Sequence, residues 1–369
     1  MMETYLTSQR CTVPQRSPAQ NSFWEYGTYQ TALLELNAPE LFLYNGSNAI
    51  PPTLTSDSDV TKLFASVDAV LAAKPAGIKP FFSDKAVGDP ASVGIPFLIR
   101  NWTLTTGSTK YATAASQQLD YLLNDVDRTD NGAISQRTNV VQVWADFMTM
   151  APPFIAYYGA ITNNYATLLE GYTQLADYHD ILFDSSAGMM QHILLGTSSI
   201  DTGHWGTGNG WACHGMLRVL RTIQLSNYAN SLKSQQSDLL GWVSTILTNV
   251  WKHQQSSGAL LNYIDGSTSS SSVFPDASGT ALLAAATFRL ASLVYGTSNA
   301  PTVNIAAAEK ARVWVVQQVG ADGWLKNGTM VDPYNWHQSG SRSPEAHSFV
   351  LMLTAAYRDW QSATKGYYN

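Results

Sequence analysis

Asp146 lies in the segment VWADFMTMAPPF, where nearly all of its neighbours are apolar or aromatic, including Trp144, Phe147 and Met148. Burial among such side chains disfavours the charged form of a carboxyl. A carboxyl in these surroundings can donate a proton to a bound molecule and later accept one, as a general acid and base does. Asp146 is therefore the first candidate catalytic residue. A buried aspartate that caps a helix or pairs with a cation is the alternative.

Two further residues could act beside such an acid. Asp89 precedes Pro90 in VGDPASVG, and this order is typical of a helix N-cap because proline fits the first helical turn. A capping role alone and a role in the site both remain open for Asp89. His192 follows an apolar turn in AGMMQHILL, where a structural histidine is the alternative to a functional one.

The segment GHWGTGNGWACHG (residues 203–215) combines five glycines with two tryptophans, two histidines and an asparagine. It lacks the phosphate-loop pattern G-x-x-x-x-G-K-[ST], and its histidines show none of the common zinc-site spacings. A glycine-rich turn that leads into a helix remains, and glycines let the backbone approach a ligand closely. Trp205, Asn209 and Trp211 then offer two aromatic faces and an amide to a sugar. A tight turn with buried tryptophans is the alternative.

Helices joined by Gly, Asn, Ser and Pro turns must position these residues. Apolar residues recur at spacings of three and four, as from Val141 to Tyr158, which predicts amphipathic helices. The last helix begins with Ser343 as N-cap and Pro344 in its first turn, and only AISQ and ALLNYI are compatible with strands. The predicted helices cover residues 22–36, 59–73, 90–106, 110–126, 138–161, 163–183, 209–225, 233–254, 277–296, 303–319 and 343–363.

This helix order predicts an all-α fold, an (α/α)6 barrel of six helical hairpins that forms a single domain over residues 1–369. A superhelical repeat is the alternative, although no fixed period is visible. In a closed ring of hairpins, the loops at one end surround a cavity. The candidate residues are expected to line it.

Composition excludes several classes of partner. Charged residues make up 13% of the chain, about half of the usual share of roughly 25%, and the net charge is −6. Lysine and arginine are scattered, so nucleic acid is not expected as a partner. No apolar run reaches the roughly 18–20 residues that cross a bilayer, so no membrane association is expected.

Low charge and the sequons at Asn45, Asn101 and Asn327 predict a secreted protein whose signal peptide is absent from this sequence. Cys11 and Cys213 are the only cysteines, and they either form one disulfide or remain two buried thiols. We expect a monomer or a weak homodimer.

Several segments together resemble the unsaturated rhamnogalacturonyl hydrolases of glycoside hydrolase family 105, which are related to the unsaturated glucuronyl hydrolases of family 88. VWADFMTMAPPF is similar to the family's W-x-D…M-x-x-P-F, HWGTGNGW to W-[GA]-R-G-N-G-W, and SPEAHSF to S-P-E-[GA]-x-x-F. FWEYGTYQTALLEL and DASGTALLAAA are more loosely similar to two further family helices. The resemblance runs from about residue 20 to residue 363.

The resemblance implies an (α/α)6 barrel that acts on oligosaccharides made by polysaccharide lyases, with no cofactor and no metal. The enzyme would hydrate the 4,5-unsaturated uronic acid at the non-reducing end. An acid protonates carbon 4, water adds at carbon 5, and the product opens to release the aglycone. By the motif match Asp146 is this acid and base, and Asp89 is the second acidic residue. The predicted substrate-binding residues are Tyr26, Trp144, His192, Trp205, Asn209 and Trp211.

Two positions depart from the family pattern. Thr207 stands where the family usually has arginine, and Ser135 aligns with a frequent histidine. Both changes remove a contact to a uronate or to the neighbouring sugar. We expect His337, Arg342 or His204 to supply the missing contact, or else the aglycone preference to differ.

Other functions remain open at this stage. An unsaturated glucuronyl hydrolase that acts on other uronides would share the same chemistry. An inverting hydrolase would need two carboxyls roughly 6.5–9.5 Å apart, a role that Asp89 and Asp146 could fill. A sugar-binding protein that has lost its activity is the alternative from another class.

Overall fold

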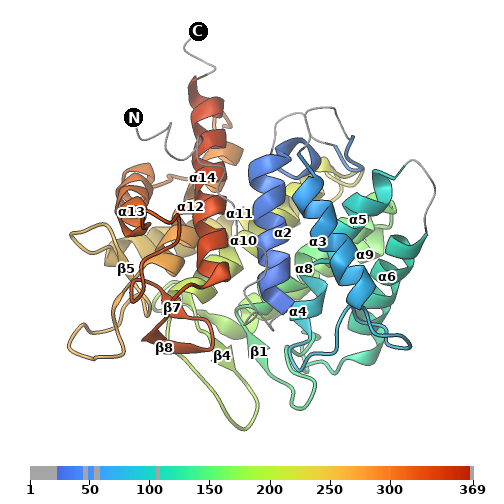
Figure 1. Cartoon of the computed structure of the whole chain (residues 1–369), viewed down its shortest axis with the longest axis horizontal. Coiled ribbons are helices and arrows are strands. Elements are labelled where there is room, and N and C mark those ends of the chain that lie inside the picture. Colours follow the sequence, from blue (N-terminus) through green and yellow to red (C-terminus); the bar gives the residue numbers. More distant parts are fainter. Residues whose placement is uncertain (1–22, 45–48, 54–58, 105–108, 299, 366–369) are drawn as a thin grey trace.

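A computed structural model of the chain describes residues 23–44, 49–53, 59–104, 109–298 and 300–365. Six helices of this part form an inner ring, in which each helix packs against the next and the last packs against the first. Figure 1 shows the first and last of them side by side at the centre of the view. The inner helices are α2 (Phe23–Asn37), α5 (Gly94–Trp102), α8 (Pro152–Ile161), α10 (Gly206–Leu225), α12 (Ala277–Val294) and α14 (Pro344–Lys365).

A second layer of helices covers this ring from outside. In the described ranges, α3 packs on α2 and α5, α6 on α5, α9 on α8, α11 on α10, and α13 on α12. The alternation of inner and outer helices is that of an (α/α)6 barrel, which confirms the predicted fold. The outer helices are α3 (Thr61–Ala73), α6 (Lys110–Asp120), α9 (Tyr165–Leu182), α11 (Lys233–Val250) and α13 (Ile305–Gln318).

Short elements connect the long helices. Four antiparallel two-stranded ladders pair β1 with β4, β2 with β3, β5 with β6, and β7 with β8. Figure 1 shows β1, β4, β7 and β8 together with α4 at the lower end of the barrel. The strands are β1 (Val143–Trp144), β2 (Phe183–Asp184), β3 (Met189–Met190), β4 (Ile193–Leu194), β5 (Leu260–Leu261), β6 (Pro275–Asp276), β7 (Val331–Asp332) and β8 (Asn335–Ser339). The short helices are α4 (Gly88–Ala91), α7 (Phe147–Met150), the 3-10 turns Pro39–Leu41 and Trp251–His253, and the π-helical turn Tyr121–Asp125.

Local sequence signals set several helix starts. Ser343 Oγ accepts the N–H of Ala346 at 3.1 Å and Pro344 is the first residue of α14, as predicted. The side chains of Asn164 and Asp276 cap α9 and α12 in the same way. The predicted strand in ALLNYI is confirmed by β5, whereas AISQ forms only one isolated bridge, from Ile134 to Arg128.

Two predicted helices are wrong in their boundaries. The helix predicted over residues 138–161 begins only at α7, because Trp144 pairs with Ile193 in the β1–β4 ladder instead. Pro152 then separates α7 from α8, since proline has no N–H with which to continue a helix. The helix predicted over residues 90–106 is divided into α4 and α5.

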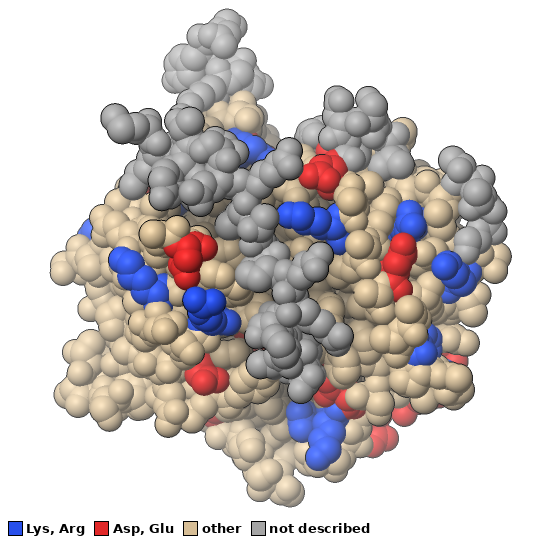
Figure 2. Space-filling view, viewed as in Figure 1, with Lys and Arg blue, Asp and Glu red and all other residues tan. Residues whose placement is uncertain are grey.

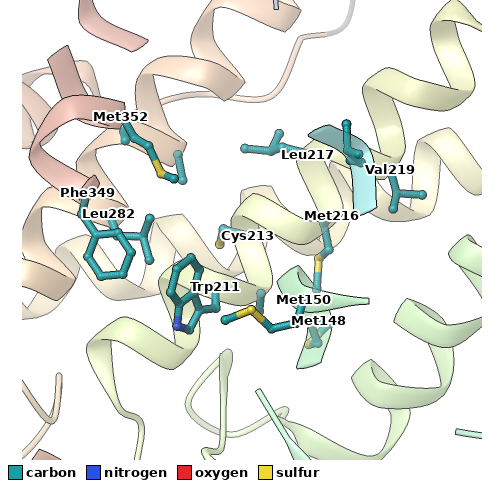
Figure 3. Packing of buried hydrophobic residues seen from close by; sticks show 14 of the residues in the cluster. Met148, Met150, Trp211, Cys213, Met216, Leu217, Val219, Leu282, Phe349 and Met352 are labelled. Carbon is teal, nitrogen blue, oxygen red and sulfur yellow. The ribbon is translucent and has the colours of Figure 1, made fainter. Parts of the chain in front are cut away.

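The glycines of residues 203–215 serve close packing inside the protein. A Cβ added at Gly215 would lie 1.9 Å from Met148 O, and one added at Gly210 would lie 2.7 Å from Leu282 Cδ2. Four of the five glycines, from Gly206 onward, belong to α10 itself, and only Gly203 precedes the helix, so the helix begins earlier than predicted. Figure 3 shows α10 packed between the side chains of the neighbouring segments, with Met148 on one side and Leu282 on the other.

Burial also defines the role of α12. Within the described ranges, α12 alone is long and apolar enough to cross a membrane by length and composition. Its residues are 89% buried, and it packs between α10, α13 and α14. This is the position of a core helix.

Two sequence predictions concern residues outside the described ranges, namely Cys11 and Asn45. Cys213 is buried in α10, and burial raises the pKa of its thiol. The disulfide between the two cysteines therefore remains a prediction.

The surface carries few charges. On the face shown in Figure 2, Lys and Arg side chains lie singly or in small groups among uncharged residues, with Asp and Glu interspersed. This agrees with the low charged content of the sequence.

Candidate active site

A chain of four polar side chains extends from Asp146 to Tyr263. Asp146 Oδ2 lies 3.5 Å from His192 Nε2, and His192 Nδ1 lies 2.9 Å from Asp201 Oδ2. The Tyr263 hydroxyl donates to the same Asp201 oxygen, while the N–H of Gly203 donates to Asp201 Oδ1 at 3.0 Å. The buried imidazole of His192 therefore lies between two carboxylates.

Backbone hydrogen bonds fix these side chains although they come from distant parts of the sequence. Beside the β1–β4 ladder, the N–H of Ala145 donates to the His192 carbonyl at 2.9 Å, and the N–H of His192 donates to the Gly203 carbonyl at 3.1 Å. A single β-bridge joins Trp205 to Tyr263. These contacts hold the acid, the imidazole and the phenol in one fixed arrangement.

The charges in this chain stabilise one another. Burial alone would lower the pKa of His192, but its contacts with Asp146 and Asp201 outweigh burial and raise it. Burial acts in the opposite direction on Asp201, and the hydrogen bonds from His192 and Tyr263 overcome it to lower the pKa of Asp201 to about 2. Near neutral pH the arrangement therefore favours an imidazolium beside an ionised Asp201.

Asp146 and His192 face each other with unused hydrogen-bonding capacity. Their separation of 3.5 Å is an ion-pair distance, yet Asp146 Oδ2 and His192 Nε2 are both buried atoms without a hydrogen-bond partner. The Asp146 side chain is 19% exposed, so it can be reached from outside. Buried polar atoms in native proteins normally have partners, and these two are placed to receive a ligand.

Three tryptophans surround the imidazole. The ring centre of His192 lies 4.4 Å from Trp205, 4.7 Å from Trp336 and 5.9 Å from Trp144. Trp144 and Trp336 are partly exposed, and their rings meet edge to face. Flat apolar rings beside a carboxyl and an imidazole are suited to the C–H faces and hydroxyls of a sugar.

Asp89 belongs to the same site but does not cap a helix. It lies inside α4, whose N-cap is Val87, so the predicted capping role is wrong. Gln136 Nε2 donates to Asp89 Oδ1 at 3.2 Å. Burial, together with the negative charges of Asp84 and Asp146, raises the pKa of Asp89 well above its usual range. The charge of Asp146 thus acts on Asp89, which places Asp89 in the electrostatic environment of the site.

Two glutamates add to the acidic character of this end of the barrel. Glu345 in the first turn of α14 accepts the indole N–H of Trp24 at 3.2 Å. Burial raises the pKa of Glu345 well above its usual range, and the charges of Glu25 and Asp146 add to this effect. Burial also raises the pKa of Glu25 to about 7. The first turns of α2 and α14 thus bring two more carboxyls to the site.

His204 lies between two carboxylates of its own. Its Nδ1 is 2.7 Å from Asp265 Oδ2, and its Nε2 is 3.5 Å from Asp184 Oδ2. The hydrogen bond with Asp265 is the main cause of a raised His204 pKa. The carboxylates therefore already compensate the positive charge of His204 within the protein.

Two predicted substrate-binding residues are structural. Asn209 is fully buried, accepts the N–H of Met190 at 2.8 Å and donates to the carbonyls of Met190 and Trp205. Trp211 is 2% exposed and packs edge to face against Phe349 in the core, as Figure 3 shows. Neither side chain faces an open site, because α10 continues through the glycines and turns both residues inward.

Three other predicted residues lie nearer the surface. Tyr26 on α2 packs near Phe82. His337 is exposed and stacks parallel to Tyr263 with ring centres 5.0 Å apart, which places it at the edge of the cluster. The Arg342 side chain is 69% exposed and pairs with Asp322.

The two departures from the family pattern occupy buried positions. Thr207 lies in the first turn of α10 and is fully buried. Ser135 is also fully buried, and its hydroxyl oxygen accepts the N–H of Gln142 at 3.2 Å and donates to the Arg137 carbonyl at 2.8 Å. Ser135 therefore stabilises the loop ahead of β1.

The sequence interpretation missed five residues of this site: Glu25, Asp201, Tyr263, Trp336 and Glu345. The sequence held a signal for two of them, because Glu345 is the acid of the SPE motif and Trp336 directly precedes the predicted binding residue His337. Asp201 and Tyr263 carry no local motif. The role of Asp201 follows only from its contact with His192, and that of Tyr263 from its hydrogen bond to Asp201.

The arrangement is suited to proton transfer on a sugar. It combines a reachable carboxyl, an imidazolium held by a second carboxylate, and aromatic surfaces. In the described ranges, no three His, Cys, Asp or Glu side chains are grouped so that they could hold a metal ion. We therefore assign no metal ligands.

Comparison with known proteins agrees with the fold. The barrel superposes on a possible family 105 member from Salmonella enterica serovar Paratyphi A with a TM-score of 0.69 and 19% identity, covering 90% of this chain and 82% of that one. A family 105 glycoside hydrolase from C. acetobutylicum gives a TM-score of 0.66 at 15% identity, covering 96% and 97%. These likenesses define the class of the fold as the (α/α)6 barrel of glycoside hydrolases.

The family follows from the sequence match. Residues 79–358 match the model of Glycosyl Hydrolase Family 88, and the chain belongs to this family. The unsaturated rhamnogalacturonyl hydrolase YesR of Bacillus subtilis is 25% identical over 148 residues, which are 37% of this chain and 43% of that protein. The matched region thus spans less than half the length of this curated relative.

Proposed function

We propose that the protein removes a 4,5-unsaturated uronic acid from the non-reducing end of oligosaccharides by hydrating its enol ether. The observation that carries the proposal is the open contact between Asp146 and His192 inside the ring of tryptophans. Membership of Glycosyl Hydrolase Family 88 supports the same chemistry. Only one proton donor is needed, in contrast to the spaced pair of an ordinary glycosidase.

Asp146 supplies the proton. Its carboxyl donates a proton to carbon 4 of the unsaturated ring, which leaves positive charge at carbon 5 and the ring oxygen. Water then adds at carbon 5 and gives up one proton to the Asp146 carboxylate, so the acid is restored. The resulting hemiketal opens, and the aglycone leaves with its original oxygen.

His192 assists Asp146 through its charge. The imidazolium lies 3.5 Å from Asp146 Oδ2 and stabilises the carboxylate that forms after proton transfer. Asp201 and Tyr263 keep the imidazole protonated and oriented. Burial raises the pKa of Asp89 and so favours its protonated form, which can donate a hydrogen bond to a substrate hydroxyl.

The preferred aglycone is a neutral sugar, as in the rhamnogalacturonan fragments of pectin. The buried carboxyls of Glu25 and Glu345 at the same end of the barrel offer no positive partner to a sulfated or carboxylated aglycone, so the charge of such a group would lose water there without compensation. The partial similarity to an unsaturated rhamnogalacturonyl hydrolase points in the same direction. Turnover of unsaturated rhamnogalacturonan disaccharides should therefore exceed that of sulfated glycosaminoglycan disaccharides.

A second candidate function is inverting hydrolysis of a saturated glycoside. The electrostatic coupling of Asp89 and Asp146 favours it, because such hydrolases use two carboxyls. The substrates separate the two functions. Hydration consumes the near-ultraviolet absorbance of the conjugated double bond, whereas hydrolysis of saturated glycosides leaves that absorbance unchanged.

The test uses the intact protein with unsaturated pectin, glucuronan and glycosaminoglycan oligosaccharides and with their saturated counterparts. Loss of absorbance together with release of the aglycone supports hydration. Release of sugar from saturated substrates alone supports inverting hydrolysis. Sugar binding without any turnover would contradict both proposals.

A further inference from the structure

A uronic acid substrate requires a positive partner, and the residues first considered do not provide one. Thr207 is buried and uncharged, His204 is held between two carboxylates, and the Arg342 side chain is paired with Asp322 at the surface. The other site residues described above are mostly acidic. A carboxylate entering this site would meet repulsion unless another cation lies nearby.

Arg137 is that cation. Its guanidinium carbon lies over the ring of Trp144, 5.5 Å from the ring centre. The side chain is half-buried, and it forms no hydrogen bond or ion pair with any other residue in the described ranges. Its positive charge also acts on Asp89, where it opposes the rise in pKa caused by burial. Arg137 therefore lies over Trp144 and acts on Asp89, while the N–H donors of its guanidinium remain unused.

The backbone around Arg137 is held in place on both sides. Its N–H donates to Ser135 Oγ at 3.1 Å, and the same hydroxyl donates to its carbonyl at 2.8 Å. A β-bridge joins Arg137 to Ala86, next to α4. Ser135, the first departure from the family pattern, thus positions the arginine.

Trp144 is equally well fixed. Its indole N–H donates to Gln142 Oε1 at 2.8 Å, and the Gln142 amide donates to the carbonyls of Leu195 and Ser198 at 3.2 and 2.8 Å. The rings of Trp144 and His192 meet edge to face. A sugar ring beside Trp144 would therefore lie within reach of both the guanidinium and the acid–imidazole pair.

We propose that Arg137 binds the carboxylate of the uronic acid and so replaces the arginine that the family usually has at the position of Thr207. A guanidinium can bind a carboxylate with two parallel hydrogen bonds, which fixes the orientation of the sugar as well as its charge. The proposal rests on the proposed function for the identity of the substrate. The carboxylate contact itself can be tested apart from turnover.

The experiment compares Arg137→Ala, Arg137→Lys and the control Lys85→Ala on two substrates, an unsaturated uronide and its methyl ester. Lys85 is exposed and lies near Arg137, because its carbonyl accepts the N–H of Thr138. The substitution Lys85→Ala therefore removes a nearby positive charge and leaves the contact between Arg137 and Trp144 in place. We expect Arg137→Ala to lower kcat/KM for the acid by about 10- to 100-fold. For the ester the change should stay within about 3-fold, because the ester has no charge to pair.

Arg137→Lys should recover part of the loss, because it keeps the charge but lacks the planar fork. Lys85→Ala should behave like wild type on both substrates. Equal losses on acid and ester, an unchanged Arg137→Ala variant, or an equal loss in Lys85→Ala would overturn the proposal. Thermal unfolding of each variant checks that the fold is kept. If Arg137→Ala does not fold, the comparison of acid and ester is made with Arg137→Lys instead.

Failure of the proposed function would be seen separately. If wild type converts neither substrate, binding of galacturonic acid and of its methyl ester is followed by tryptophan fluorescence. Weaker binding of the acid alone in Arg137→Ala still supports the carboxylate contact. If every variant keeps the wild-type preference for the acid over the ester, the carboxylate contact is contradicted.

Discussion

Replacing Asp201 by asparagine tests the charge network around His192. The pKa of Asp201 is about 2 in the folded protein, against an ordinary value of 3.8. This difference of just under two pKa units corresponds to about 2 kcal/mol of folding free energy, at about 1.4 kcal/mol per unit. The Asp201 side chain is only 16% exposed, so solvent screens this contribution little.

The sign of the effect sets its pH dependence. Because folding lowers the pKa of Asp201, its stabilisation is fully present above about pH 4 and is lost as the pH falls through about 2. We therefore expect Asp201→Asn to reduce the free energy of unfolding by about 2 kcal/mol at pH 7. The difference from wild type should shrink between pH 4 and pH 2.

Urea unfolding followed by tryptophan fluorescence measures this difference at several pH values. Asp265→Asn is the matched control, since Asp265 also pairs with a histidine but its side chain is 36% exposed. Its loss should stay below about 1 kcal/mol because water screens an exposed pair. An Asp201→Asn variant as stable as wild type at pH 7, or a difference that does not change toward low pH, would refute the reasoning.

The remaining predictions concern packing, binding and specificity. Gly215→Ala should reduce the free energy of unfolding by about 3 kcal/mol or more, or prevent folding, because the new Cβ would meet the backbone of α7. Gly241→Ala on the exposed face of α11 should raise the free energy of unfolding by up to about 1 kcal/mol. Thermal unfolding compares the two variants. Trp336→Ala should raise KM about 10-fold with a smaller change in kcat, since it removes a stacking surface beside His192, and steady-state kinetics would contradict this if kcat alone fell. Glu345→Gln should change the ratio of kcat/KM for sulfated to neutral aglycones more at alkaline than at neutral pH, because burial raises the pKa of Glu345 and its carboxyl gains charge only as the pH rises; a ratio that changes equally at both pH values argues against this electrostatic role.

Much of the barrel could be predicted from the sequence because its helices are long and regularly amphipathic. Local signals such as Ser343 and Pro344 also placed the start of α14 correctly. The segment ahead of α7 was predicted as helix because its apolar residues continue the helical spacing. Only the pairing of Trp144 with Ile193, a contact between distant segments, shows that the chain is extended there.

The site was predictable where a residue carried a motif and much less where it acts through a partner. Asp146 could be selected by its apolar neighbours. His192 was selected only by its place after an apolar turn and by its match to a binding position of the family. Asp201 and Tyr263 could not be found, since Asp201 acts through His192, nine positions before it, and Tyr263 acts through Asp201, 62 positions before it. Asn209 and Trp211 matched the motif yet face the core, because a motif gives residue order but not the direction of a side chain.

The most direct test of the account is the rate at which Asp146→Asn consumes an unsaturated uronide. Asparagine keeps the size of the side chain but cannot donate and recover a proton. We predict that loss of the double-bond absorbance slows by about 10²- to 10⁴-fold, while thermal unfolding remains close to that of wild type. A folded Asp146→Asn variant that consumes the substrate at the wild-type rate would contradict the central role of Asp146.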